Sequence, residues 1–228
     1  IRDMESGNQE ILNAINKGYT IEKVISSFEL TKKIGILTLG YFMVGLPTET
    51  DEDIEAIGNL VKQAMARGRK HRKSVNINVT VSTFVPRPHT PFQWARQISS
   101  EEIEEKHTLL KKYVRGRGIN LSTHDAPSSF LEGVFARGDR QLCKVLLSAY
   151  KRGCRFDGWS DQLNFQAWMD AFEEFSRGAG IPACAGRQEC SLRSPTASPY
   201  GLPHSYLRER AIDEILPWDH ISPLVEKR

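Results

Sequence analysis

The stretch ILTLGYFMVGLPTETDED, residues 36–53, decides the expected fold. An apolar run over residues 36–44 is ended by a Gly-Leu-Pro turn at 45–47, and a helix is predicted to begin at Thr50. The run lacks alternation, which is typical of a strand buried on both faces of a parallel sheet. Because ligands bind at the carboxyl ends of parallel strands, this turn is a candidate binding site. An ordinary strand–turn–helix unit without a ligand is the alternative.

Composition sets broad limits on the protein. The 228 residues are 39% hydrophobic and 26% charged, which is ordinary for a globular protein with one large domain, or a medium domain with an appendage. A formal net charge of +3 is too small to imply nucleic-acid binding by itself. No apolar run approaches the ~20 residues of a membrane span and no signal-peptide pattern opens the chain, so a cytoplasmic protein without a membrane partner is expected. The chain begins at Ile1 without Met, and we expect a fragment.

The cysteines show no established metal or disulfide pattern. Cys143 and Cys154 are expected to be buried thiols in a reducing compartment. Cys184 and Cys190 flank a Gly-containing loop, where chelation of a metal or a disulfide bridge is the alternative to free thiols.

Helical periodicity and capping residues predict several helices around the first strand. Ser6 or Asn8 is expected to cap a helix that ends at Gly18, and Thr20 a helix that ends at Gly35. A third helix runs from Thr50 to Gly68, a fourth begins at a Ser99–Glu102 capping box, and the chain is mainly helical from residue 128.

A second strand and a stiff loop follow the third helix. Residues 75–83, VNINVTVST, alternate strictly, so one face is apolar and the other polar. The polar face is expected to point into a barrel lumen, where a substrate meets it, or to solvent. The next stretch, 84–94, contains three prolines between aromatic residues, which suits a flat ligand such as adenine or simply covers a core.

Four short motifs occur in one order: ESGN at 5–8, NKGYT at 16–20, FMVGLPTET at 42–50 and FVPRPHTP at 84–91. Together they resemble the second half of a radical S-adenosylmethionine (SAM) core, and in particular an uncharacterised group of bacterial proteins that begin with a B12-binding-like domain. The resemblance implies an α/β fold: the C-terminal half of a partial (β/α) TIM-like barrel, followed by a mainly helical extension. The expected divisions are 1–122 for the barrel part, 123–176 for the helical extension, 177–205 for an irregular insert and 206–228 for a tail.

The resemblance also implies a cofactor pocket. Glu5 and Ser6 would contact the ribose or the amino-acid part of SAM, and backbone groups around Val44 and Gly45 would read the polar edge of adenine. The implied cofactor-binding residues are Glu5, Ser6, Phe42, Val44, Gly45, Pro47, Phe84, Val85 and Pro86. No catalytic residue and no metal ligand is implied within the chain.

One defining motif of the radical SAM family is absent from this sequence. The C-x-x-x-C-x-x-C cysteines that hold a [4Fe–4S] cluster are expected upstream of Ile1. The full-length protein would then be an iron–sulfur enzyme that forms a 5′-deoxyadenosyl radical on an unknown substrate, with cobalamin as an open question. The chain alone is expected to be inactive, and its partner would be the N-terminal remainder of the same protein.

Two alternatives stay open at this point. A basic cluster on both sides of Gly68 could bind RNA as a noncatalytic interaction module, although cations at a helix C-terminus are favourable without any ligand. That cluster consists of Arg67, Arg69, Lys70, Arg72 and Lys73. The other alternative is an inactive gene fragment, with exposed strand edges that favour aggregation.

Overall fold

The computed structural model describes residues 3–36, 38–178 and 201–221, and these form two compact units. The first unit comprises residues 1–84 and 98–126, and the second comprises residues 85–97 and 127–228. Each unit has its own hydrophobic core. The predicted insert at 177–205 lies mostly outside the described residues, as do Cys184 and Cys190.

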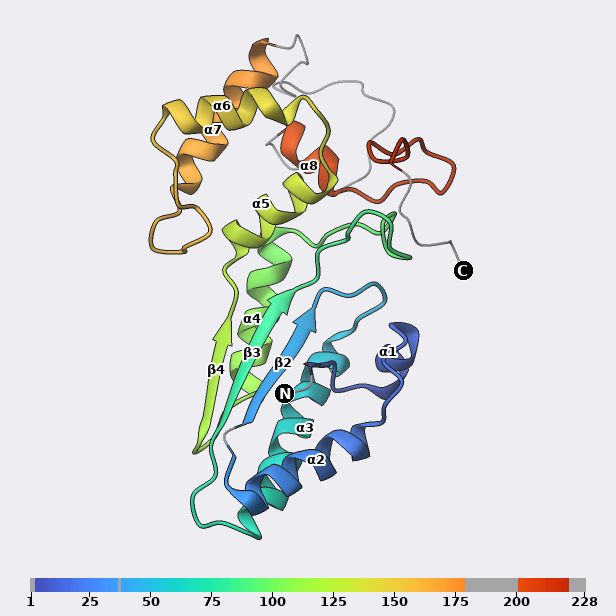
Figure 1. Cartoon of the computed structure of the whole chain (residues 1–228), viewed down its shortest axis with the longest axis vertical. Helices are drawn as coiled ribbons and strands as arrows, with labels where there is room; N and C mark the ends of the chain where they lie inside the picture. Colours follow the sequence, from blue (N-terminus) through green and yellow to red (C-terminus); the bar gives the residue numbers. More distant parts are fainter. Residues whose placement is uncertain (1–2, 37, 179–200, 222–228) are drawn as a thin grey trace. The chain divides into compact units, whose positions relative to one another are not determined.

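The first unit alternates strands and helices (Figure 1). Its elements are β1 (Asp3–Glu5), α1 (Gln9–Ala14), α2 (Ile21–Ile34), β2 (Thr38–Val44), α3 (Asp51–Arg69), β3 (Ile77–Thr83), α4 (Ser100–Tyr113) and β4 (Ile119–Thr123). The strands are all parallel and lie in the order β1-β2-β3-β4. This arrangement confirms the predicted α/β class and fits part of a (β/α) barrel.

One face of this sheet is covered by α2, α3 and α4. Phe42 and Val44 of β2 and Val79 of β3 are buried there together with apolar side chains of the three helices. These helix residues include Phe28, Ile57 and Leu110. The apolar face predicted for residues 75–83 is therefore this helix-covered face.

The other face of the sheet is open within the described residues. Burial alternates along β2, and Tyr41 is 37% exposed, so the expectation that this strand is buried on both faces is wrong. An apolar composition alone could not reveal that no described element packs on the second face. Along β3, partly exposed Asn78, Thr80 and Ser82 alternate with buried neighbours, which confirms the predicted polar face.

The predicted caps of α1 and α4 are found in the structure, whereas the predicted ends of α1 and α3 are wrong. Asn8 caps α1, and Ser99 with Glu102 forms a capping box on α4. However, α1 ends at Ala14 rather than at Gly18, and α3 passes Gly68 and ends at Arg69. A Cβ on Gly68 would lie 3.0 Å from Phe28 Cε1, so this glycine permits close packing of α3 on α2 and does not end the helix.

The second unit is mainly helical and has a core of aromatic and aliphatic side chains. Its helices are α5 (Ala126–Arg137), α6 (Leu142–Lys151), α7 (Phe165–Gly178) and α8 (Gly201–Leu207). Residues 85–97 contain neither helix nor strand, as three prolines predict.

Polar contacts hold this irregular segment in the second unit. Arg137 is fully buried and donates to the carbonyl oxygens of Ala95 and, at 2.8 Å, Arg208. The backbone N–H of Arg210 donates to Trp94 O at 2.8 Å, and the indole N–H of Trp218 donates to Gln93 Oε1 at 2.8 Å. The residues after α8 therefore complete the hydrogen bonding of residues 85–97. We call this set of contacts the arginine clasp.

Candidate functional site

The carboxyl ends of β1, β2 and β3 meet at one edge of the sheet because the strands are parallel. At this edge, β1 turns sharply at Glu5, whose φ of 56° lies in the left-handed region. The Ser6 N–H donates to Met4 O at 2.7 Å, and Ser6 Oγ accepts from the Asn8 N–H at 3.1 Å. Ser6 is only 1% exposed, so its hydroxyl serves this turn.

Glu5 forms an ion pair that the sequence analysis did not anticipate. Its Oε1 lies 2.7 Å from Lys17 Nζ, and the Glu5 side chain is 13% exposed. Lys17 belongs to the NKGYT motif that follows α1. The edge therefore carries a fixed carboxylate with a neighbouring ammonium group, a pair suited to polar ligand groups.

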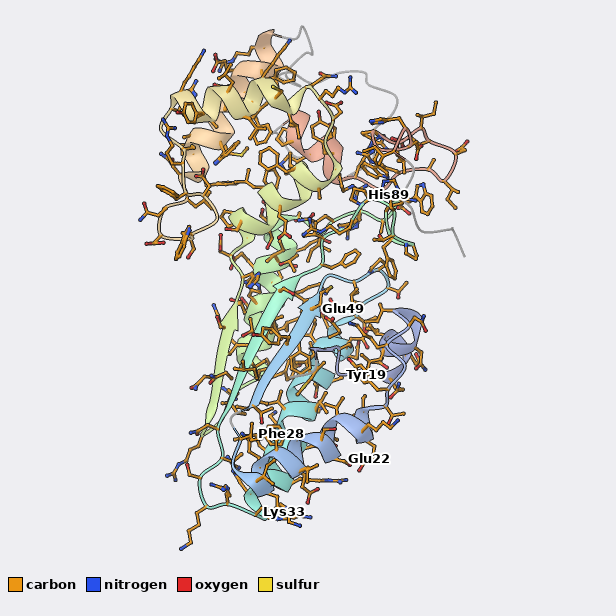
Figure 2. The ribbon with its side chains drawn as sticks, in the orientation of Figure 1. Tyr19, Glu22, Phe28, Lys33, Glu49 and His89 are labelled. Atoms are coloured by element: carbon orange, nitrogen blue, oxygen red, sulfur yellow. The ribbon has the colours of Figure 1, made fainter. Side chains whose placement is uncertain are left out.

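The turn after β2 is closed by a second carboxylate, Glu49 (labelled in Figure 2). Gly45, at φ 85°, donates its backbone N–H to Glu49 Oε2 at 2.7 Å, and Lys106 Nζ of α4 lies 2.9 Å from the same oxygen. The Glu49 side chain is 1% exposed. Burial raises the pKa of this carboxyl above its ordinary value, although the Gly45 N–H and Lys106 oppose the increase. An acidic residue shortly after a Gly-Pro turn was the only sequence signal for this role.

A third carboxylate joins the starts of α1 and α3. Asp53 accepts from the Thr50 N–H at 2.8 Å and from Asn8 Nδ2 at 2.5 Å. Burial raises the pKa of Asp53, but these hydrogen bonds outweigh burial and hold it below the ordinary value. Asp53 therefore fixes the loop after β1 against the loop after β2.

The residues implied for a cofactor pocket differ in whether their side chain or their backbone could contact a ligand. Phe42 and Val44 point into the helix-covered core, so a ligand at this edge would meet their backbone rather than their side chains. The Val44 carbonyl already accepts from the Phe84 N–H at 2.8 Å. Pro47 is half-buried and Phe84 is buried in the first unit, whereas Val85 and Pro86 belong to the second unit.

Two observations bear on whether these residues fit a nucleoside cofactor. The Thr83 hydroxyl, at the last position of β3, is buried without a hydrogen-bond partner among the described residues. Gly45 occupies a position where a side chain would be strained, since a Cβ there would also lie 2.6 Å from Ile98 Cδ1. The Thr83 hydroxyl and the Glu5 carboxylate are polar groups of the kind that fit the hydroxyl and amine groups of SAM.

The described residues do not fit an iron–sulfur cluster. They contain two cysteines, exposed Cys143 and buried Cys154, both in the second unit. In residues 3–36, 38–178 and 201–221, no group of three or more His, Cys, Asp or Glu could hold a metal ion. No step through a cluster is therefore derived from these residues.

The basic cluster lies at the opposite end of the first unit. It spans the last turn of α3 and the residues that follow, before β3, at the amino ends of the strands, and Lys33 marks the same end in Figure 2, far from Glu49. Arg67 Nη1 lies 2.9 Å from Glu22 Oε1, and Arg69 donates to Arg117 O at 2.9 Å. Part of the cluster is therefore engaged within the chain.

No helix in the described part of the chain is both long and apolar enough to cross a membrane.

Comparison with known proteins identifies the part of the chain that carries β1, β2 and most of α3. A family model described as the radical SAM superfamily matches residues 3–61. An uncharacterized protein of Methanocaldococcus jannaschii is 33% identical over 144 residues, which are 62% of this chain and 30% of that protein. A tRNA-2-methylthio-N(6)-dimethylallyladenosine synthase of Petrotoga mobilis is 39% identical over 61 residues, which are 26% of this chain and 14% of that protein.

Other relatives match shorter parts. An uncharacterized methyltransferase of Pyrococcus horikoshii is 38% identical over 60 residues, which are 26% of this chain and 13% of that protein. The chain spans about a third or less of the length of these curated relatives. No solved structure matches the chain.

Proposed function

This chain belongs to the radical SAM superfamily, and we propose that its first unit supplies the adenosine-binding side of a SAM pocket. The observation that carries the proposal is the carboxyl edge of the sheet, where the turns after β1 and β2 bring Glu5, Ser6 and Gly45 to one side. Two relatives are named tRNA-2-methylthio-N(6)-dimethylallyladenosine synthases, which supports an enzyme family rather than a simple scaffold.

Each residue of this edge has a proposed part. The Glu5 carboxylate accepts hydrogen bonds from ribose hydroxyls or from the methionine ammonium group, and Lys17 keeps it oriented. Glu49 holds the Gly45 turn in place by accepting its N–H. The Phe42–Pro47 backbone and Phe84 border the adenine.

The chemistry of the whole protein is a further part of the proposal. A [4Fe–4S] cluster held by other polypeptide would supply the electron for reductive cleavage of SAM, and the first unit of this chain would hold the adenosine part of SAM. The cluster ligands come from polypeptide outside residues 1–228, since the four cysteines of this chain lack the required spacing. We propose that this additional polypeptide pairs with β1, that the chain is inactive without it, and that the enzyme works in the reducing cytoplasm. Use of cobalamin has no support in the described residues.

Binding of S-adenosylhomocysteine, an unreactive SAM analogue, tests the pocket. With anaerobically purified full-length protein, isothermal titration should show binding that Glu5→Gln weakens about tenfold or more, since a charged hydrogen bond contributes ~1.5–3 kcal/mol. Glu10→Gln, an exposed change on α1, should leave the affinity unchanged. Wild-type protein that does not bind the analogue, or an unchanged affinity in Glu5→Gln, would reject the pocket.

The reaction needs a separate test. The same preparation should show iron–sulfur absorbance and should release 5′-deoxyadenosine only when SAM is present. Absence of both signals would reject the radical SAM activity of the full-length protein.

A second proposal is that the basic cluster docks RNA. It is favoured by the exposed side chains of Lys70 and Lys73 at the end of α3, and by relatives that act on tRNA. Lys70→Glu with Lys73→Glu should weaken tRNA binding and lower the salt dependence of the affinity by about two phosphate contacts. Lys62→Glu, also exposed on α3, is the matched control. Equal salt slopes for the double variant and wild type would exclude this cluster.

A further inference from the structure

In three strands, β2, β3 and β4, the open face of the sheet presents side chains that carry no formal charge, whereas Asp3 of β1 aligns with Tyr41. In β2, β3 and β4 the positions facing away from the helices contain apolar, amide and hydroxyl groups. They are Leu39, Tyr41 and Met43 of β2, Asn78, Thr80 and Ser82 of β3, and Asn120 and Ser122 of β4. A ligand that rests on β2, β3 and β4 therefore meets hydrogen-bonding groups and an aromatic ring.

The strand register places these groups in rows. Leu39 aligns with Asn78, which aligns with Asn120. The next row up contains Tyr41, which aligns with Thr80. β2 is thus the apolar and aromatic side of the face, and β3 with β4 is the hydrogen-bonding side.

The side-chain amides of Asn78 and Asn120 form a hydrogen-bonded pair that can make further hydrogen bonds. Asn120 Nδ2 donates to Asn78 Oδ1 at 2.9 Å. Asn78 Nδ2 and Asn120 Oδ1 then have no partner among the described residues, so a donor stands beside an acceptor. The edges of nucleobases carry the matching acceptor and donor; a single Asn or Gln side chain recognises adenine with such a donor and acceptor, and here two side chains would supply them.

Tyr41 supplies the flat surface that a base would also require. Its side chain is 37% exposed, and its hydroxyl has no hydrogen-bond partner among the described residues. With strands about 4.8 Å apart and ~3.3 Å of rise per residue, the Cα atoms of Tyr41 and Asn78 lie about 8 Å apart. Aromatic rings stack on bases, which gives contact area without a charge.

We propose that this open face holds a nucleobase of the substrate, stacked on Tyr41 and read by the Asn78–Asn120 amide pair. The proposal rests on the proposed function, because it places the substrate on the sheet whose carboxyl edge binds SAM. It names the substrate class as nucleoside-containing and makes Tyr41, Asn78 and Asn120 specificity-determining residues.

The test uses nucleosides as probes on the full-length protein. S-adenosylhomocysteine is added to saturation first, so that adenosine cannot enter the cofactor pocket. Adenosine and cytidine are then titrated and detected by saturation-transfer NMR, with ribose and N-acetylglycinamide as probes of the sugar and of a simple amide. Binding of adenosine or cytidine that is tighter than the binding of ribose and of N-acetylglycinamide supports the proposal.

The variants separate this face from the cofactor edge. Asn120→Asp and Tyr41→Leu should each weaken the nucleoside at least about tenfold, the discrimination that a paired amide contact supplies, and leave S-adenosylhomocysteine unchanged. Asn59→Asp, exposed on α3, should change neither affinity. Both altered residues are exposed, so folding should survive, and thermal melts check this.

Failures of the two proposals differ. If wild-type protein binds S-adenosylhomocysteine but no nucleoside, or if Asn120→Asp and Tyr41→Leu bind nucleosides normally, the nucleobase site is wrong and the cofactor pocket stands. Tighter binding of N-acetylglycinamide than of the nucleosides would assign the face to a peptide amide and would also overturn the proposal. Loss of S-adenosylhomocysteine binding in the wild type would overturn both.

Discussion

The first unit gains its core from the faces of regular elements, whereas the second joins irregular segments through buried polar groups. In the first, Phe28 of α2 and Val79 of β3 are buried in a continuous apolar layer between helices and sheet. In the second, Arg137 and Arg210 donate to backbone carbonyls of segments far apart in sequence. In the first unit, the helices cover one face of the sheet, so the other face and the carboxyl edge of the strands are available for binding. In the second unit, the arginine clasp positions residues 85–97, which form no regular backbone hydrogen bonds of a helix or strand.

This contrast can be followed experimentally because all four tryptophans lie in the second unit: Trp94, Trp159, Trp168 and Trp218. Tryptophan fluorescence therefore reports on that unit, while far-UV circular dichroism reports on both. Coincident transitions by the two probes would mean that the whole chain unfolds as one cooperative system.

The largest effect is expected in the apolar layer. Phe28→Ala removes a side chain that is 2% exposed and should cost about 3–5 kcal/mol of stability, because it leaves a cavity in the core. Urea denaturation followed by circular dichroism measures the loss. Leu30→Ala, on a residue that is 60% exposed, should be nearly neutral. Equal losses in the two variants would contradict the described core of the first unit.

A somewhat smaller effect is expected in the arginine clasp. Arg137→Met should cost about 2–4 kcal/mol, because the carbonyls of Ala95 and Arg208 lose buried donors. Burial lowers the pKa of Arg137 to about 10, so it remains charged at neutral pH. Tryptophan fluorescence in urea should report the loss, and exposed Arg140→Met is the control. A wild-type midpoint in Arg137→Met would show that polar contacts do not hold the second unit.

The Gly45 turn should show a more modest effect. Gly45→Ala places a side chain at φ 85° and should cost about 1–2 kcal/mol. Gly158→Ala, where an added Cβ meets nothing within 4 Å, should change stability by less than about 0.5 kcal/mol. The difference between the two midpoints is the measurement. If it vanishes, the left-handed turn at the binding edge is wrong.

The smallest effect is expected in the pH dependence caused by Glu49. Burial raises its folded-state pKa, so the protonated form favours folding. The stabilising contribution of protonation is complete below the unfolded value of 4.5 and is lost as pH rises through the folded value. Compared with Glu49→Gln, the wild type should therefore gain stability as pH falls from 7 toward 4. The slope should stay below the ~1.4 kcal/mol per pH unit of one whole proton. A relative gain toward high pH would mean that Lys106 outweighs burial.

Parts of the candidate site could be predicted from particular residues. The turn predicted at residues 45–47 follows β2 in the structure, because turn formation depends on the residues of a short segment, whereas the assignment of the ESGN motif at 5–8 to a cofactor pocket stays a prediction. The ion pairs of Glu5 with Lys17 and of Glu49 with Lys106 were missed, since partners 12 and 57 positions apart carry no periodic signal. The core positions of Phe42 and Val44 were also missed, because an apolar run does not tell which face meets the helices.

By itself, the sequence determined the strands near 36–44 and 75–83, the capping box at Ser99 and the alternation along β3, and it limited the cap of α1 to Ser6 or Asn8. These features depend on interactions between residues that are close together in the sequence, so a short segment is enough to predict them. Only the tertiary structure decided that the second face of β2 is open, that Asn78 meets Asn120, and that Arg137 joins residues 95 and 208. Such contacts depend on strand register and on long-range packing, where many residues could serve equally well until the fold selects one.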